Sequence, residues 1–258
     1  MNPAPKTVYS DLLSEIFSAV VKTKSEFKIR SWERKAESLK SVDLFQYKLM
    51  LAILETYRNE NKKARSTTQA ALLLTQSNVH KAMAYRVIGN SYTHQGNYRK
   101  AMDSYWTAYT LTLNPDYFYA FFNTGTSYDL YDERMNNMKS LNLNDQKIIK
   151  KELEDLKEEI QNLKNSNLNL DIYRDILSAA YAVFFSNCSG KITRFPSVSD
   201  SNISTILFKP ELDLDTIGLL NDEMNNSLVN LLEKYEYDEL LKYPIIFTSE
   251  NYSKNTAS

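Results

Sequence analysis

Residue types that catalyse reactions or bind metals are sparse in this chain. It has two histidines, His80 and His94, and a single cysteine, Cys188. None of the three lies at the spacing from another histidine or cysteine that zinc sites use. The five glycines are scattered, so no glycine-rich loop is available to cradle a phosphate group. A Gly-x-Ser-x-Gly nucleophile elbow is also missing.

Cys188 and His94 are the two side chains whose reactivity or titration could contribute to function. Cys188 ends an apolar helical segment, where a thiol usually packs inertly, although Lys191 close by could activate it. His94 would make binding sensitive to pH between about 5 and 8 if its ring touched a ligand. Acidic residues are numerous, but their spacing singles out no catalytic pair. We therefore predict that the protein is not an enzyme and uses no metal or other cofactor.

The composition is that of a folded helical protein. Of 258 residues, 43% are hydrophobic and 24% are charged, with a net charge of −1 that gives no general attraction to nucleic acid or membrane. Glycine and proline, with 5 and 6 residues, are too rare for a turn-rich sheet. A single cysteine, the absence of a signal pattern at the start and the lack of an 18-residue apolar window together predict a cytoplasmic protein.

A repeated helical pattern between residues 82 and 128 is the clearest signal in the sequence. An aromatic residue, a small or aliphatic residue, a glycine and a tyrosine recur at fixed spacing, with 36 residues between the two glycines. The two copies are Tyr85, Ile88, Gly89, Tyr92 and Phe121, Thr124, Gly125, Tyr128. Between them, Ala101, Tyr105 and Ala108 lie on one face of a second predicted helix, and Pro115 closes the unit.

This pattern resembles the tetratricopeptide repeat, a helical hairpin with a period of about 34 residues. The resemblance implies that Gly89, Ala101 and Gly125 lie where helices approach closely, with aromatic side chains such as Tyr105 filling the gaps beside them. It covers residues 82–115 fully and only the first helix of the next repeat. An earlier, degenerate copy has Tyr57, Ala64 and Ala71 near the expected places.

We accordingly predict a mainly α fold: a tetratricopeptide-like array of antiparallel helical hairpins, an α-solenoid, with a small α+β element near the C-terminal end. The predicted parts are capping helices over 1–42, the array over 43–141, a long amphipathic helix over 142–168, a helix with a β-hairpin element over 169–250 and a disordered tail over 251–258.

The two regions after the array carry different patterns. In the amphipathic helix, Ile149, Leu153, Leu156, Ile160 and Leu163 alternate spacings of four and three. Such a stripe either packs on the array or forms the seam of a homodimer. In the C-terminal element, apolar runs at 192–198 and 203–208 flank a polar turn and predict two strands. A helix over 215–234 and a final strand over 243–248 follow.

In tetratricopeptide arrays, the first helices of successive repeats line a concave groove that holds a segment of a partner. The resemblance implies the following groove residues here: Met83, Arg86, Asn90, Thr93, His94, Tyr119, Phe122, Asn123 and Thr126. Amides can bond a peptide backbone and aromatic rings can take apolar anchors. Arg86 with Asn90 and Asn123 also resembles part of the family's carboxylate clamp, although the clamp's third-repeat cations have no counterpart.

These features predict a protein–protein interaction module, an adaptor, chaperone or regulatory subunit, that binds a peptide or helix segment of another protein. One alternative is a regulator gated by a signalling peptide or small ligand, with nucleic acid contacted by the basic stretch Lys22–Lys40. That stretch has seven basic and three acidic residues, and is either a solvated face or a docking patch for an acidic partner. Another alternative is a self-associating structural protein.

Overall fold

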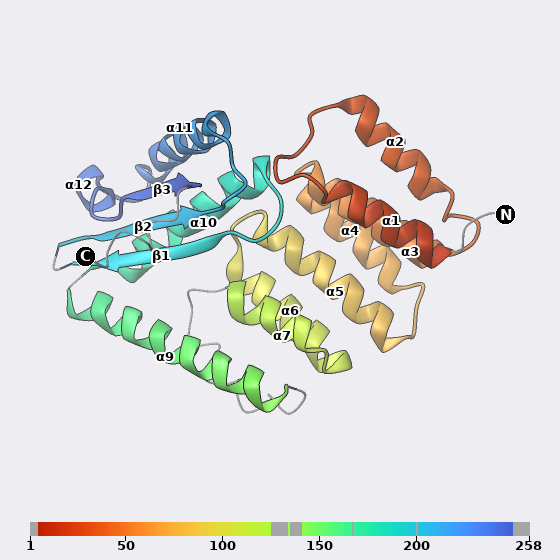
Figure 1. Ribbon diagram of the computed structural model, residues 1–258, viewed down its shortest axis with the longest axis horizontal. Coiled ribbons are helices and arrows are strands. Elements are labelled where there is room, and N and C mark those ends of the chain that lie inside the picture. Colours follow the sequence, from red (N-terminus) through yellow and green to blue (C-terminus); the bar gives the residue numbers. More distant parts are fainter. Residues whose placement is uncertain (1–4, 125–133, 135–140, 167, 200, 250–258) are drawn as a thin grey trace. The chain divides into compact units, whose positions relative to one another are not determined.

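The protein is seen in a computed structural model that describes residues 5–124, 134, 141–166, 168–199 and 201–249 (Figure 1). Over these residues the chain is mainly helical with one small three-stranded sheet, which confirms the expected mainly α class. The chain forms two compact units, unit 1 over residues 1–147 and unit 2 over 148–258. Gly125 and Tyr128 of the repeat pattern, the predicted groove residue Thr126, and the predicted tail over 251–258 lie outside the described residues.

Unit 1 is built from consecutive helices, most of them joined by short turns and α1 to α2 by a longer segment (Figure 1). They are α1 (Pro5–Ile16), α2 (Glu26–Glu37), α3 (Leu44–Tyr57), α4 (Asn61–Leu72), α5 (Asn78–Thr93), α6 (Tyr98–Thr112) and α7 (Pro115–Thr124). α3 packs on α4 and α5 packs on α6, so that each pair is a helical hairpin. α7 then packs on α6, where the ring centroids of Tyr109 and Phe118 are 5.2 Å apart.

Local sequence signals set the ends of these helices. The Asp43 carboxylate accepts a hydrogen bond from the Gln46 backbone N–H at 2.9 Å and begins α3, as its position predicts. Ser77 and Asn97 begin α5 and α6 in the same way. Gly96, with φ of 70°, turns the chain between α5 and α6 through the left-handed region that glycine adopts without strain.

The α5–α6 hairpin is held by a very close contact between Gly89 and Tyr105. A Cβ atom placed on Gly89 would lie 2.5 Å from Cε1 of the Tyr105 ring, well inside contact distance. Ala101 and Ala108 on α6 are fully buried, as small residues at a tight helix contact are expected to be. The ring of Tyr105 therefore occupies space that only glycine leaves open at position 89.

α1 and α2 complete the core of unit 1 against α3. Leu12 and Ile16 of α1 and Trp32 of α2 are each no more than 2% exposed, in one apolar cluster with residues of α3. α3 is buried on nearly all sides. Its buried residues are Phe45, Tyr47, Leu49, Met50, Ala52, Ile53, Leu54, Thr56 and Tyr57. A helix that is apolar all round must be covered all round, and α1 and α2 supply part of that cover.

Unit 2 combines helices with a three-stranded sheet. Its elements are α10 (Leu170–Asn187), β1 (Thr193–Val198), β2 (Ile203–Phe208), α11 (Leu214–Leu231), α12 (Tyr237–Leu240) and β3 (Ile245–Thr248). β1 and β2 form an antiparallel hairpin with Thr193 opposite Phe208, and β2 pairs with β3 in parallel. A parallel pair needs a crossover, which α11 and α12 supply. All three strands occur where the sequence predicts strands.

The core of unit 2 lies on one face of β2 and along α10. Ile203, Thr205 and Leu207 alternate as buried residues on that strand, while α10 buries Tyr173 and Phe184. Cys188 follows α10 directly, has no exposed surface, and its backbone N–H donates to the Phe184 carbonyl at 2.7 Å.

The long amphipathic helix is α9 (Leu143–Asn165), and it spans the boundary between the units. Ile149, Leu153, Ile160 and Leu163 of its apolar stripe are buried, and Leu156 is half-buried. The stripe is thus covered within the chain, and a homodimer formed along it would first have to expose these side chains.

Candidate protein-binding face of the helical array

The predicted groove residues fall on α5 and α7 of unit 1, apart from Thr126, which lies outside the described residues. On α5 and its C-cap, Arg86 is exposed, while Met83, Asn90, Thr93 and His94 are half-buried. On α7, Asn123 is exposed, Tyr119 is half-buried and Phe122 is buried. The predicted groove side chains therefore differ greatly in how accessible they are to a partner protein.

Asn90 and Thr93 both lie within hydrogen-bond distance of the hydroxyl of Tyr105, the residue whose ring packs on Gly89. The Tyr105 hydroxyl donates to Oδ1 of Asn90 at 2.8 Å and lies 3.1 Å from Oγ1 of Thr93. Thr93 Oγ1 also donates to the Gly89 carbonyl at 3.1 Å. Burial raises the pKa of Tyr105 to about 12, so the phenol keeps its proton. Because its oxygen already accepts the Tyr105 hydrogen bond, Asn90 offers a ligand chiefly the N–H donors of its amide.

His94 belongs to the interior of unit 1. Its ring Nδ1 is buried, and burial lowers the pKa of His94 to about 3, with the charge of Lys22 acting in the same direction. Lys22 lies in the segment between α1 and α2, where its Nζ donates to Oδ1 of Asn59 at 3.0 Å. His94 is therefore neutral between pH 5 and 8, the range in which the sequence suggested a pH-sensitive contact.

Arg86 is the exposed cation of this face and has aromatic neighbours on two other helices. Its guanidinium carbon lies 5.9 Å from the centroid of the Tyr117 ring on α7, within cation–π range. Tyr9 of α1 is 8% exposed, and burial raises its pKa while the charge of Arg86 lowers it. Sequence spacing gave no indication of Tyr9 or Tyr117, because only the packing of α1 and α7 brings them to Arg86.

α1 covers part of the same face. Tyr9 and Leu12 of α1 share an apolar cluster with Val87 of α5, and Met83 packs against that cluster. The groove expected from the sequence is thus partly filled by the chain's own first helix. Arg86 stands at the edge of the covered part, with Asn90 one helical turn further along α5.

Unit 2 holds a second group of buried polar side chains. Arg194 on β1 donates from Nη1 to Oε1 of Glu159 at 3.0 Å and to the Tyr173 hydroxyl at 3.1 Å. The Tyr173 hydroxyl also lies 3.2 Å from Oγ1 of Thr205 on β2. Burial raises the pKa of Glu159, and the guanidinium of Arg194 opposes this rise. Because these groups bond to one another, we interpret them as a brace joining α9, α10 and the sheet.

Two other kinds of site have no candidate within the described ranges of the chain. No group of three or more His, Cys, Asp or Glu side chains there is placed to hold a metal ion. None of the helices described is both long enough and apolar enough to cross a membrane.

Comparisons with known proteins add no candidate function. Neither models of protein families, nor curated proteins, nor solved structures match this chain. The geometry of unit 1 is therefore the ground for proposing what the protein does.

Proposed function

We propose that the chain is a protein-binding module of the tetratricopeptide type, an adaptor, chaperone or regulatory subunit rather than an enzyme, that acts in the cytoplasm. It holds a segment of a partner protein on the face formed by Arg86, Asn90, Tyr117, Tyr119 and Asn123, here called the α5–α7 face. Support comes from the paired hairpins of unit 1 and from the Gly89–Tyr105 contact, which lies at the position where the repeat family has small residues.

The observation that carries the proposal is the pair of donors on α5. Arg86 is exposed and makes no ion pair among the described residues, and its guanidinium has donors only. Asn90, one turn away, has its oxygen occupied by Tyr105 and retains the donors of its amide. Two such groups side by side require a ligand that supplies acceptors, so a carboxylate or successive peptide carbonyls suit them.

α7 adds the rest of the recognition surface. Asn123 is exposed and can bond a peptide backbone, and the half-buried Tyr119 offers ring surface to an apolar side chain. Tyr117 is buried and contributes through its cation–π contact with Arg86. Because α1 already covers the adjoining part of α5, the face fits a short segment better than a long helix. We therefore expect a ligand of a few residues in which a carboxylate neighbours an apolar side chain.

The test begins with peptides selected from a random display library against the full chain, and then measures their affinity by fluorescence anisotropy. Arg86→Ala should weaken binding at least tenfold, about 1.4 kcal/mol, because a charge-assisted bond is lost. Arg86→Lys should be intermediate, since lysine cannot bond a carboxylate bidentately. Arg99→Ala is the matched control, because Arg99 is an exposed arginine on α6.

Helical content measured by circular dichroism must stay the same in all three variants. If the Arg86→Ala chain binds the selected peptides as tightly as the Arg99→Ala chain, the α5–α7 face is not the binding site. Replacing the ligand's carboxylate by an amide should cost affinity in the unaltered protein but little in Arg86→Ala, which links the carboxylate to this side chain.

A further inference from the structure

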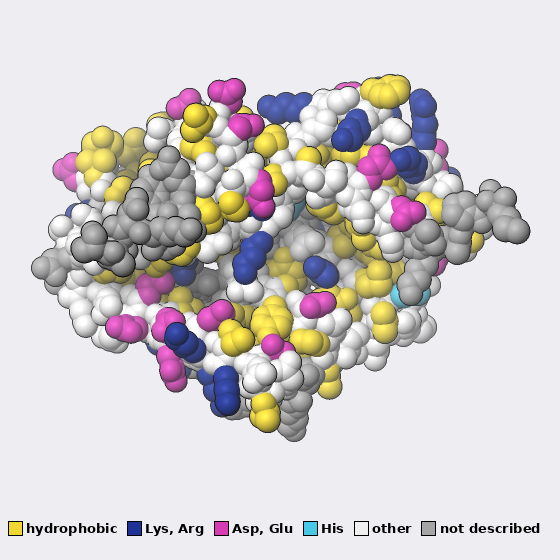
Figure 2. All heavy atoms as spheres, viewed as in Figure 1, with side chains coloured by type: hydrophobic (Ala, Val, Ile, Leu, Met, Phe, Trp, Pro, Cys, Tyr) yellow, Lys and Arg dark blue, Asp and Glu magenta, His cyan; other side chains and the backbone are white. Residues whose placement is uncertain are grey.

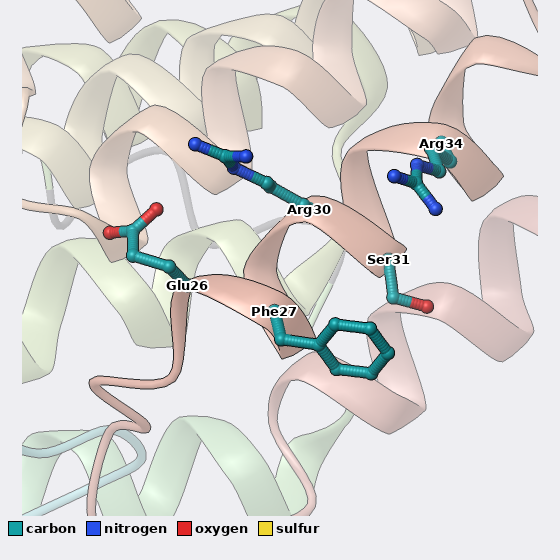
Figure 3. Close-up of a pocket in the computed structure, with 5 residues that line it drawn as sticks. All are labelled: Glu26, Phe27, Arg30, Ser31 and Arg34. Carbon is teal, nitrogen blue, oxygen red and sulfur yellow. The ribbon is translucent and has the colours of Figure 1, made fainter.

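A second surface lies on α2, away from the α5–α7 face. Glu26, Phe27, Arg30, Ser31 and Arg34 line a shallow hollow of about 380 Å³ along this one helix (Figure 3). Phe27 is 84% exposed, and Arg30 and Arg34 are exposed as well. Figure 2 shows Lys and Arg side chains gathered over α2 with hydrophobic side chains beside them. We call Phe27, Arg30 and Arg34 the α2 face.

The two arginines of the α2 face are not neutralised within the described part of the chain. Of the carboxylates on α2, Glu33 pairs with Arg58 at 2.9 Å and Glu26 with Arg58 at 3.6 Å, while the exposed Glu37 forms no ion pair with Arg30 or Arg34 among the residues described. Neither a hydrogen bond nor an ion pair involves Arg30 or Arg34 over the described residues. Like charges one turn apart on a helix repel each other, so an anionic partner would stabilise this arrangement.

The chain itself supplies a surface of the opposite kind. Unit 1 has 20 basic and 14 acidic residues, a net charge of +6, whereas unit 2 has 11 basic and 18 acidic residues, a net charge of −7. The overall charge of −1 conceals this division. Opposite net charges on two units of one chain favour the association of copies, because each copy presents both signs.

A part of unit 2 with the complementary character runs from the end of α11 through α12. Here exposed carboxylates alternate with exposed apolar side chains: Leu232, Glu233, Glu236, Tyr237, Asp238 and Leu241. Tyr237 is 62% and Leu241 57% exposed. In the described residues, Glu233, Glu236 and Asp238 form no ion pair or hydrogen bond through their side chains. We call residues 232–241 the acidic segment.

We propose that the α2 face of one copy binds the acidic segment of a second copy. Arg30 and Arg34 pair with its carboxylates, and Phe27 packs against the apolar side chains between them. The two surfaces differ, so the contact is head-to-tail. In a pair joined by one such contact, one copy keeps its acidic segment unused and the other keeps its α2 face unused. Assembly therefore continues until it closes into a ring or forms a longer chain. This contact does not involve the α5–α7 face and does not depend on the proposed peptide binding.

The first experiment measures molar mass by sedimentation velocity on the nuclease-treated full chain over a concentration series. At 50 mM salt the mass should rise with concentration, and at 500 mM salt it should return to that of a single copy, because screening weakens surface charge pairs. A single copy at every concentration in 50 mM salt would overturn the proposal.

Two sets of charge reversals provide the stricter test. Arg30→Glu with Arg34→Glu removes the basic surface, and Glu233→Lys with Glu236→Lys and Asp238→Lys removes the acidic one. Each variant alone should be a single copy at 50 mM salt. An equimolar mixture should associate again, because the intact α2 face of one variant meets the intact acidic segment of the other, and the two reversed surfaces also carry opposite charges.

Lys62→Glu with Arg99→Glu is the control, since both residues are exposed in unit 1 and the change in net charge is the same. This control should associate like the unaltered chain, and Phe27→Ala should weaken association about tenfold or more. A mixture of the two reversed variants that contains no dimer, or a control that dissociates as fully as the Arg30/Arg34 variant, would overturn the proposal.

Discussion

Because Gly89 has no side chain, the Tyr105 ring can pack against it and its hydroxyl can bond Asn90 of the α5–α7 face. Alanine within a helix normally stabilises it by about 1 kcal/mol relative to glycine. Here the added methyl group would meet the Tyr105 ring at 2.5 Å, so Gly89→Ala should instead lower the free energy of unfolding by about 1–3 kcal/mol. Urea denaturation followed by circular dichroism measures the change.

Gly218 provides the opposite case on α11. A Cβ atom there would meet nothing within 4 Å, so Gly218→Ala should raise the free energy of unfolding by up to about 1 kcal/mol. If Gly89→Ala were as stabilising as Gly218→Ala, the close contact between Gly89 and Tyr105 would be wrong.

His94 should make unit 1 less stable in mild acid. Its pKa is lowered from the ordinary value of 6.5 to about 3, so the unfolded chain binds a proton at pH 5 that the folded chain does not. Stability is therefore full above about pH 6.5 and falls as the pH decreases toward 3. Between pH 6.5 and 5 the loss should be about 1–2 kcal/mol.

Urea denaturation at these two pH values measures that loss. His94→Gln should remove most of it, whereas His80→Gln, at a half-exposed histidine stacked on Phe45, should leave it in place. An unchanged pH dependence in His94→Gln would show that His94 is not the group that titrates.

At the scale of elements, the buried pair of Arg194 and Glu159 joins β1 to α9. Both side chains are about 15% exposed, at 16% and 14%. Arg194→Leu would leave the Glu159 carboxylate buried without its counter-ion, and we expect a loss of about 3–5 kcal/mol in thermal or urea unfolding. Replacing both residues by leucine should restore most of that loss, because no buried charge then remains.

The exposed pair of Lys234 and Asp175 in the same unit is the comparison. Lys234 is 61% exposed, so Lys234→Leu should change the stability far less than Arg194→Leu does. Equal effects of Arg194→Leu and Lys234→Leu would mean that burial does not determine the contribution of the Arg194 pair.

The elements themselves could be predicted from the sequence far better than the contacts between them. The repeat pattern and the spacing of apolar residues indicated helices such as α5, α6 and α9, and apolar runs on either side of a polar turn indicated the strands. Arg194 and Glu159 are 35 residues apart and no local pattern relates them. The same holds for the parallel pairing of β3 with β2, since a strand's own sequence does not specify the direction of its neighbour.

The candidate site shows the same division between local and long-range information. The repeat spacing indicated that Arg86, Asn90 and Asn123 lie on first helices of repeats. It did not indicate that Tyr105 would occupy the oxygen of Asn90, or that α1 would cover part of the face. Both depend on side chains brought together from distant helices, and α1 lies outside the repeat pattern.

For the whole molecule, the division into two units predicts two unfolding transitions. Each unit has its own buried core, centred on α3 in unit 1 and on α10 and β2 in unit 2. In differential scanning calorimetry, Gly89→Ala should lower one transition temperature and Gly218→Ala should raise the other. A single transition that both variants shift would show that the chain unfolds as one cooperative body.

The buried thiol of Cys188 offers a way to time these events without altering the protein. It is the only sulfhydryl group in the chain and belongs to unit 2, so an alkylating reagent can react only when that unit opens. The rate of alkylation under native conditions therefore measures how often the surroundings of Cys188 open. Bound peptide on the α5–α7 face should leave this rate unchanged, whereas a second copy seated on residues 232–241 should slow it.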